Sequence, residues 1–233
     1  MKRWRLAKIK KALREVSNKG WIKGRRKGDT GVGEALEHEL GLKESNIALP
    51  DFGIMELKSQ RINTKSMTTL FTKKPEGITN KEIRARFGYK DREFPEVKCL
   101  RQTIKGGKKN KRDFWCKIDR QNGRMLIKKN RITIGYYSLE FLEQKAREKI
   151  GDGLIFVLAD IKKENGNEFF YYKKAYLLKD IDPSKFLMHS KYDIRLGVYR
   201  TGIKKGLPHD HGSAFRLFQK SFPDVFKIRR SLL

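Results

Sequence analysis

Cysteine is scarce in this chain, and internal repeats and low-complexity linkers are missing from it. The 2 cysteines, Cys99 and Cys116, show no CxxC spacing. Neither a disulfide framework nor a zinc site is therefore indicated, and both thiols are interpreted as buried or incidental. The 233 residues are enough to bury a proper core in one domain or in two closely joined lobes.

Long hydrophobic runs are also missing. The longest apolar stretch, GLIFVLADI, is far too short to cross a bilayer. The basic start, MKRWRLAKIKKALREV, has no continuous apolar core of the kind that a signal peptide needs. We therefore expect a soluble protein of the cytoplasm with no membrane partner.

Acidic residues are few relative to basic ones. The chain has 55 Lys and Arg against 27 Asp and Glu, a formal net charge of +28, and the excess runs from one end to the other. The charge thus belongs to the folded body and predicts a polyanionic partner, nucleic acid before any other. Ribosomal or histone-like binders share such a charge. A membrane-surface protein would need a long amphipathic anchor, and none follows the N-terminal segment.

The hydrophobic pattern predicts a mixed α/β chain whose sheet is built mainly from hairpins. Apolar residues recur at helical spacing in three places: near the N-terminus, before Gly41 and after Ser138. Gly41 is expected to cap the C-terminus of its helix, and Ser138 the N-terminus of its helix. Strands follow from apolar runs, with Asn122-Gly123 as one hairpin turn. The expected helices cover about residues 6–16, 32–40 and 139–150, and the strands 47–61 in two parts, 67–74, 114–119, 124–129, 154–160, 169–178 and 191–200. Residues 73–113 are polar and basic, with no assigned element, and end in a loop.

Two carboxylates and a lysine stand together in the stretch LPDFGIMELKSQR. In a strand, Glu56 and Lys58 project from the same side, and a bend after Asp51 can bring its carboxylate beside that of Glu56. Such a pair of carboxylates, Asp51 and Glu56, can hold a hard cation such as Mg²⁺. Lys58 would then lie near the attacking water and the scissile phosphate. The pattern P-D-x4-E-x-K is typical of PD-(D/E)XK nucleases, although a solvated Glu/Lys pair on a surface strand gives the same letters.

Glu37 is the candidate for a further acid at this site. It stands on the helix before the motif, with Gly33 one turn below it, so nothing larger than hydrogen blocks the helix flank. A helix carboxylate ahead of the Asp is where PD-(D/E)XK nucleases often keep an additional metal-site acid. The competing interpretation is a solvated residue among the neighbouring glutamates.

The stretch KYDIRLGVYR predicts a strand with one polar face of mixed charge. Asp193, Arg195 and Tyr199 alternate with apolar residues and therefore share that face. Arginine pairs with guanine and aspartate accepts from the cytosine amino group, so the face suits a C·G target. Arg216, between two apolar residues, is a second candidate for guanine. These charges could instead contact phosphates or only water.

The loop that follows is basic and ends in HDHG. Lys204 and Lys205 favour phosphate contacts, because lysine is a compact point charge. His209 and His211, with Asp210 between them, are candidates for base or phosphate contact. Ordinary loop residues and metal ligands are the alternatives for the two histidines.

Three segments resemble the MvaI/BcnI family of restriction endonucleases, relatives of the mismatch-repair nickase MutH. They are GDTGVGEALE, LPDFGIMELKSQRINTKSMTTLFTKKP and DIRLGVYRTGIKKGLPHDHGSAFRL. Weaker likeness in RFGYKD, RQTIKGG and KKAYLL extends the resemblance over nearly the whole chain. It is more similar to the MvaI type, which cuts CC/WGG, than to the BcnI type, which cuts CC/SGG and carries an Arg in place of His211.

The resemblance implies a two-lobed, MutH-like PD-(D/E)XK fold with a DNA-binding cleft. Residues 1–180 would form a catalytic lobe on the minor-groove side, and residues 181–233, alone or with parts of 75–110, a recognition lobe on the major-groove side. Asp51, Glu56 and Lys58 would be the active-site triad and Glu37 an accessory acid. The implied activity is Mg²⁺-dependent double-strand cleavage by a monomer that nicks one strand and then the other, alongside a cognate DNA methyltransferase. A MutH-like nickase and a non-catalytic basic nucleic-acid-binding protein are the alternatives.

Overall fold

The computed structural model describes residues 4–28, 30–42, 51–52 and 55–233. Two compact units divide the chain. Unit 1 takes in the described parts of residues 1–68, 147–183 and 218–233, and unit 2 takes in residues 69–146 and 184–217. The division departs from the expected split at residue 180, because residues 69–146 pack with the segment 184–217 and the last residues pair with unit 1.

Unit 1 is built on a five-stranded sheet in the order β1-β10-β9-β2, with β13 also paired to β10. The long β9-β10 pair is the expected hairpin, whereas β2 runs parallel to β9. Among the described strands β2 has no second neighbour. The strands are β1 (Ile22–Lys23), β2 (Met55–Arg61), β9 (Gly153–Glu164), β10 (Asn167–Ile181) and β13 (Phe226–Ser231).

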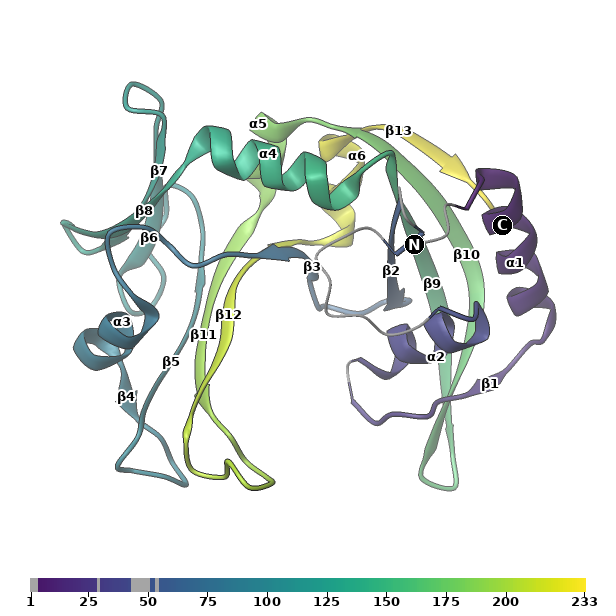
Figure 1. Ribbon diagram of the computed structural model, residues 1–233, viewed down its shortest axis with the longest axis horizontal. Helices are drawn as coiled ribbons and strands as arrows, with labels where there is room; N and C mark the ends of the chain where they lie inside the picture. The colour runs from purple at the N-terminus through teal and green to yellow at the C-terminus, as the bar shows by residue number, and fades with distance from the viewer. Residues whose placement is uncertain (1–3, 29, 43–50, 53–54) are drawn as a thin grey trace. The chain divides into compact units, whose positions relative to one another are not determined.

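Two helices cover one face of this sheet (Figure 1). The predicted apolar stripe of α1 (Leu6–Asn18) is buried. The residues of α2 (Gly31–Glu39) that face the sheet are buried as well. Tyr172 of β10 donates its hydroxyl to the Val32 carbonyl over 2.8 Å, which ties α2 to the sheet. Gly41, at φ +67°, ends the helix as predicted. On the opposite face lie the short helices η1 (Gln219–Ser221) and α6 (Phe222–Val225), where Phe222 packs edge-on against Phe156.

Unit 2 contains two sheets built mainly from antiparallel pairs. The larger runs in the order β3-β12-β11-β5-β4, and the smaller, β6-β7-β8, includes the predicted hairpin with Gly123 at its turn. Helix α4 (Leu139–Ile150), capped by Ser138 as predicted, begins in unit 2 and ends in unit 1. The remaining elements are β3 (Thr68–Thr72), α3 (Asn80–Phe87), β4 (Tyr89–Lys90), β5 (Lys98–Ile104), β6 (Phe114–Asp119), β7 (Arg124–Lys129), β8 (Ile132–Ser138), α5 (Pro183–His189), β11 (Lys191–Val198) and β12 (Pro208–Leu217).

The prediction of no helix or strand in residues 73–113 was wrong, because the stretch contains α3, β4 and β5. A signal for α3 was present in the sequence. Thr79 accepts from the Glu82 backbone N–H over 3.2 Å, and Glu82 accepts from the Thr79 N–H over 2.8 Å, which is a capping box. Both cysteines are buried, and burial raises the pKa of the Cys116 thiol to about 12. No helix in the described ranges has the length and apolar character to cross a membrane.

Candidate functional site

Glu56 and Lys58 of the P-D-x4-E-x-K motif lie at the start of β2. Leu57 points its side chain into the core beneath α1 and α2 and is 4% exposed, so its neighbours face the other side of the strand. Its backbone N–H donates to Asp51 Oδ2 over 2.8 Å, which anchors that carboxylate to the backbone between Glu56 and Lys58. The structure therefore joins Asp51 to the strand that carries the other two motif residues. The predicted bend falls partly on residues 53–54, which lie outside the described residues.

Glu56 is a buried carboxylate with ammonium groups beside both of its oxygens. Its side chain is 2% exposed, with Oε1 2.6 Å from Lys58 Nζ and Oε2 2.9 Å from Lys149 Nζ. The contact with Lys58 confirms that the two project from the same side of β2. Neither oxygen accepts a hydrogen bond of good geometry from the described residues. A buried carboxylate held by charge, with lone pairs still available, is suited to bind a cation.

Lys149 was not predicted as a site residue. It lies on the last turn of α4, directly before β9, and reaches Glu56 because β9 runs beside β2 in parallel register. Met55 pairs with Gly153 at the start of this register and also bridges Gly151. Parallel neighbours far apart along the chain leave no local pattern, so the sequence contains no signal for this contact.

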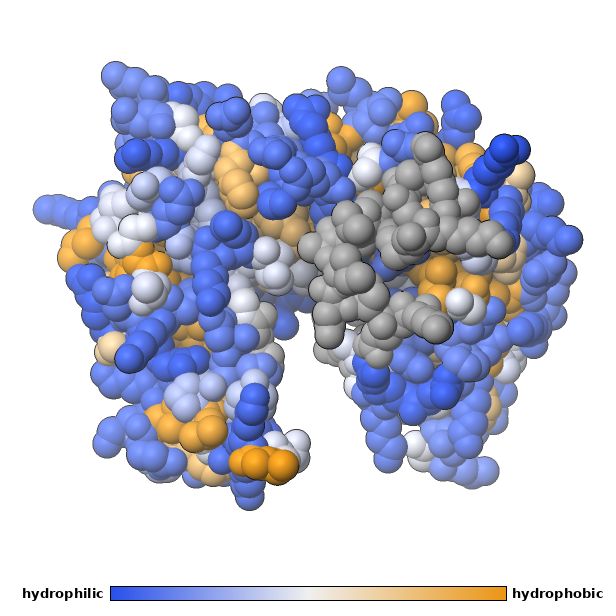
Figure 2. Space-filling model, in the orientation of Figure 1, coloured by the Kyte–Doolittle hydropathy of each residue, from blue (hydrophilic) through white to orange (hydrophobic). Residues whose placement is uncertain are grey.

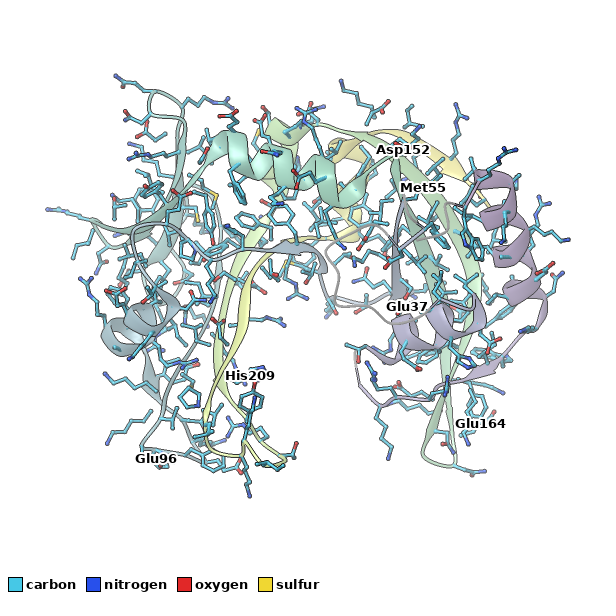
Figure 3. All side chains as sticks on the ribbon, viewed as in Figure 1. Glu37, Met55, Glu96, Asp152, Glu164 and His209 are labelled. Carbon is cyan, nitrogen blue, oxygen red and sulfur yellow. The ribbon has the colours of Figure 1, made fainter. Side chains whose placement is uncertain are left out.

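Glu37 projects from α2 (Figure 3) and lines a cavity between residues of α2 and β2. A Cβ built at Gly33 would lie 3.6 Å from Ser59 Oγ and 4.0 Å from Glu37 Oε1, which are ordinary contact distances, so the space on this flank does not depend on the glycine. Glu37 and Lys58 share this cavity of about 240 Å³. Its walls are Arg26, Thr30, Val32, Gly33, Glu34, Glu37, Leu57, Lys58 and Ser59.

These residues can accommodate a divalent metal ion. Within the described ranges, no three acidic, His or Cys side chains gather closely enough to form a ready-made cluster. Mg²⁺, however, is commonly held by only one or two carboxylates, with waters and substrate phosphates completing its octahedron. Glu56, whose buried oxygens accept no hydrogen bond of good geometry from the described residues, and Asp51, anchored to the same strand, provide that number of carboxylates.

The strand expected over residues 191–200 is β11, which ends at Val198 and has the expected polar face at Asp193 and Arg195. Tyr192, Ile194, Leu196 and Val198 are at most 3% exposed and lie in the core of unit 2. Asp193 and Arg195 lie on the other face, where the neighbouring strand β12 adds Arg216.

Asp193 is the centre of this polar face. Its side chain is 4% exposed, and Oδ2 accepts from Arg216 Nη1 over 2.8 Å and lies 3.5 Å from Arg195 Nε. Oδ1 is buried and accepts no hydrogen bond from the described residues. Arg195 is 50% exposed and Arg216 only 13%, so the two arginines offer very different access to a partner.

A β-bulge sets the direction of these side chains. The register of β11 and β12 shifts between Ile194 and Leu196, so that Arg195 faces two residues of β12 in place of one. Gly212, at φ +79°, supplies the left-handed conformation that this kind of bulge favours. As a result His209 lies on the polar face, opposite Gly197.

The loop between β11 and β12 is fixed at its base. Tyr199 stacks on His209 with ring centroids 3.9 Å apart and an angle of 10° between planes. Arg200 makes a two-pronged contact with Asp91, at 2.7 and 2.6 Å, and holds the pKa of that carboxyl well below its usual range. Lys204 and Lys205, farther along the loop, are exposed, as phosphate contacts require. Most of the described surface seen in Figure 2 is hydrophilic.

Asp210 lies apart from the other predicted DNA-binding residues. Opposite Leu196, it faces the other side of β12, where its oxygens accept from Asn80 Nδ2 and the Gly212 N–H, each over 2.7 Å. Its carboxylate thus joins the bulge to α3. The side chain of His211 lies outside the described part of the chain.

Comparison with known proteins identifies a family. The model of the MvaI/BcnI restriction endonuclease family matches residues 10–226. A structure titled "Restriction endonuclease MvaI-cognate DNA substrate complex" is 30% identical, with a TM-score of 0.88 over 97% of both chains. A second, "Restriction endonuclease MvaI in the absence of DNA", is 29% identical, with a TM-score of 0.56 over 100% of both. No curated protein matches. The chain belongs to the MvaI/BcnI restriction endonuclease family.

Proposed function

We propose that this chain, a type II site-specific deoxyribonuclease by its family, hydrolyses DNA at the Asp51, Glu56 and Lys58 site with Mg²⁺. The observation that carries the proposal is the buried Glu56 carboxylate, beside Lys58 and on the strand that anchors Asp51. Restriction endonucleases generally use divalent metal ions. Bound here, Mg²⁺ would lower the pKa of a water and offset charge on the phosphate.

The protein residues have separate tasks in this proposal. Asp51 and Glu56 hold the metal, and Glu37 is an accessory acid on the neighbouring helix. Lys58 reaches the scissile phosphate, where its ammonium group offsets the charge that grows on the phosphorus oxygens and orients the attacking water. Lys149 holds the second Glu56 oxygen and so positions the carboxylate before the metal binds.

Sequence recognition is assigned to the polar face of unit 2. The unpartnered Asp193 Oδ1 is an acceptor for the cytosine amino group, and Arg195 and Arg216 are donors to guanine. His209, stacked on Tyr199, is held rigidly for a base or phosphate contact, whereas Asp210 is assigned to shaping the bulge. Together with the likeness to the MvaI type, these groups support CC/WGG as the target.

Strand cleavage is proposed to be sequential. The chain has one P-D-x4-E-x-K motif, hence one active site, and a target with a central A·T pair has no exact two-fold symmetry. A monomer can nick one strand and rebind in the opposite orientation to cut the other. A restriction enzyme of this kind acts in the cytoplasm, where a methyltransferase of matching specificity must protect the cell's own DNA.

A supercoiled plasmid with a single CC/WGG site tests the proposal. With Mg²⁺, nicked circles should appear before linear DNA, also with enzyme in excess, and EDTA should stop both steps. Accumulation of nicked circles alone would favour a nickase in the manner of MutH. Retarded but intact DNA at every metal concentration would contradict the assigned active site, and direct linearisation by a stable dimer would contradict sequential nicking.

A further inference from the structure

Strand β5 adds its own side chains to the polar face of β11. The two strands are antiparallel, with Thr103 opposite Asp193 and Arg101 opposite Arg195. Facing residues of antiparallel strands project from the same side of a sheet. Arg101 and Thr103 are exposed, so β5 extends the face on which Asp193 lies.

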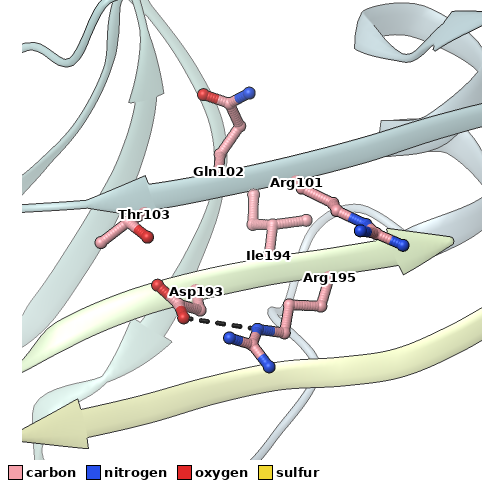
Figure 4. A pocket seen from close by; sticks show the side chains of 6 residues that line it. All are labelled: Arg101, Gln102, Thr103, Asp193, Ile194 and Arg195. Atoms are coloured by element: carbon pink, nitrogen blue, oxygen red, sulfur yellow. Dashed lines mark ion pairs between the residues drawn. The ribbon is translucent and has the colours of Figure 1, made fainter. Parts of the chain in front are cut away.

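A cavity of about 400 Å³ lies over this part of the sheet, and Figure 4 shows Asp193, Arg195 and Arg101 around it. The buried Asp193 Oδ1 in its wall accepts no hydrogen bond from the described residues. An unsatisfied buried carboxylate oxygen is costly in the free protein and is satisfied when a ligand brings a donor. The cavity is therefore built for a ligand with a hydrogen-bond donor. It is lined by Arg101, Gln102, Thr103, Asp193, Ile194 and Arg195.

Arg101 contributes an unused donor group to the same cavity. Arg195 and Arg216 both contact Asp193 Oδ2, whereas Arg101 makes no ion pair or side-chain hydrogen bond within the described ranges. Its guanidinium is a planar fork of donors that matches the O6 and N7 acceptors of guanine. The cavity thus places a free acceptor and a free donor fork on neighbouring strands.

We propose that Arg101 reads a guanine of the target in the major groove, next to the cytosine read by Asp193. A C·G pair presents the cytosine amino donor and the guanine acceptors side by side, and the major groove admits a two-stranded β-ribbon. The inference rests on the proposed function and deepens it, because it adds a specificity residue on β5.

Duplexes in which one guanine at a time is replaced by 7-deazaguanine, which lacks the N7 acceptor, test this assignment. Binding is measured in Ca²⁺ for the wild type, Arg101→Ala, Arg101→Lys and Arg120→Ala. Arg101→Ala should lose on the order of ten- to a hundred-fold in affinity for the target, with little loss on random DNA. Arg101→Lys keeps the charge but loses the fork, and should lose discrimination too. Arg120, exposed in the turn of the β6-β7 hairpin, is the control and should keep full discrimination.

The decisive experiment is a double-mutant cycle that combines the substitution of Arg101 with the substitution of one guanine. At one guanine, 7-deazaguanine should weaken the wild type but cause no further loss in Arg101→Ala, while the variant keeps its sensitivity at the other guanines. Equal losses on target and random DNA, or unchanged sensitivity at every guanine, would overturn the assignment and leave the proposed function standing. A wild type that prefers no sequence would overturn the proposed function itself, and the role of Arg101 with it.

Discussion

Replacing the lysines around Glu56 with methionine should destabilise unit 1 in a strongly non-additive way. The Glu56 side chain is 2% exposed, and its oxygens lie 2.6 Å from Lys58 Nζ and 2.9 Å from Lys149 Nζ. Methionine keeps much of the apolar stem of lysine but has no charge. Each single variant leaves one ammonium group beside the carboxylate, whereas the double variant leaves the buried carboxylate without either of these two ammonium groups.

The expected magnitudes follow from this burial. Each single substitution should lower the free energy of unfolding by about 1–2 kcal/mol, since one buried oxygen loses a part-exposed partner. The double substitution should cost about 3–5 kcal/mol, which corresponds to a melting temperature lower by roughly 6–20 °C. Adding Glu56→Gln to the double variant removes the charge and should recover most of the loss. Lys11→Met is the control, because the Lys11–Glu15 pair is 3.9 Å long with side chains 81% and 61% exposed.

Thermal unfolding with and without Ca²⁺ is the assay. A cation bound at Glu56 replaces the missing positive charge, so Ca²⁺ should raise the melting temperature of the double variant more than that of the wild type. Glu56→Gln should abolish that rise. The reasoning would be refuted by a double variant as stable as Lys11→Met, or by a Ca²⁺ response that survives Glu56→Gln.

Three further outcomes are expected. Asp51→Ala should abolish cleavage and weaken the contribution of the metal to DNA binding; retention of full Mg²⁺-dependent activity would show that the metal site is misplaced. Lys204→Ala and Lys205→Ala should each weaken binding to all sequences alike and lower the salt slope by about 1, and a sequence-dependent loss would argue for base contact. Because the folded pKa of Asp91 is depressed, its pair with Arg200 contributes stability above the unfolded pKa of about 3.9, which is lost as pH falls through the folded value. The difference in unfolding free energy between the wild type and Arg200→Ala should therefore be constant between about pH 5 and 8 and shrink below about pH 4, and a constant difference at all pH values would contradict this pairing.

Local signals were enough to predict β2, which carries Glu56 and Lys58, and the two helices packed against its sheet. The apolar stripe of Ile9, Leu13 and Val16 lies within one helix. Gly41 ends the next helix because glycine readily adopts a positive φ. The alternation around Leu57 likewise places Glu56 and Lys58 on one side of β2. These features depend on neighbours within a few residues, which is why the sequence contains them.

Long-range pairing accounts for what was missed. Lys149 meets Glu56 only because β9 runs parallel to β2, and Arg101 joins the polar face only because β5 pairs with β11. Neither pairing has a local pattern. In β5 the buried neighbours Cys99 and Leu100 also interrupt the alternation by which an exposed face is recognised.

The bulge in β12 is a different case. The prediction that HDHG ends a loop was wrong, because these residues lie in β12, but the glycine that marks the bulge was present in the sequence. In a strand without a bulge, the side chains of Asp210 and of its two histidine neighbours would alternate between the two faces of the sheet. Gly212 at positive φ inserts one residue against Arg195 and turns Asp210 towards Asn80. A glycine after HDH in a strand is a known mark of such an irregularity.

The central claim is that the unit 1 site performs the chemistry while other residues bind DNA, and Lys58→Ala tests it most directly. Lys58 is 30% exposed beside Glu56, and the proposed base and phosphate contacts belong to unit 2. The measurement is cleavage of a single-site duplex in Mg²⁺ under single-turnover conditions, together with its binding in Ca²⁺. We predict that Lys58→Ala binds the site nearly as tightly as the wild type and cuts neither strand. Near-normal cutting by this variant would contradict the account.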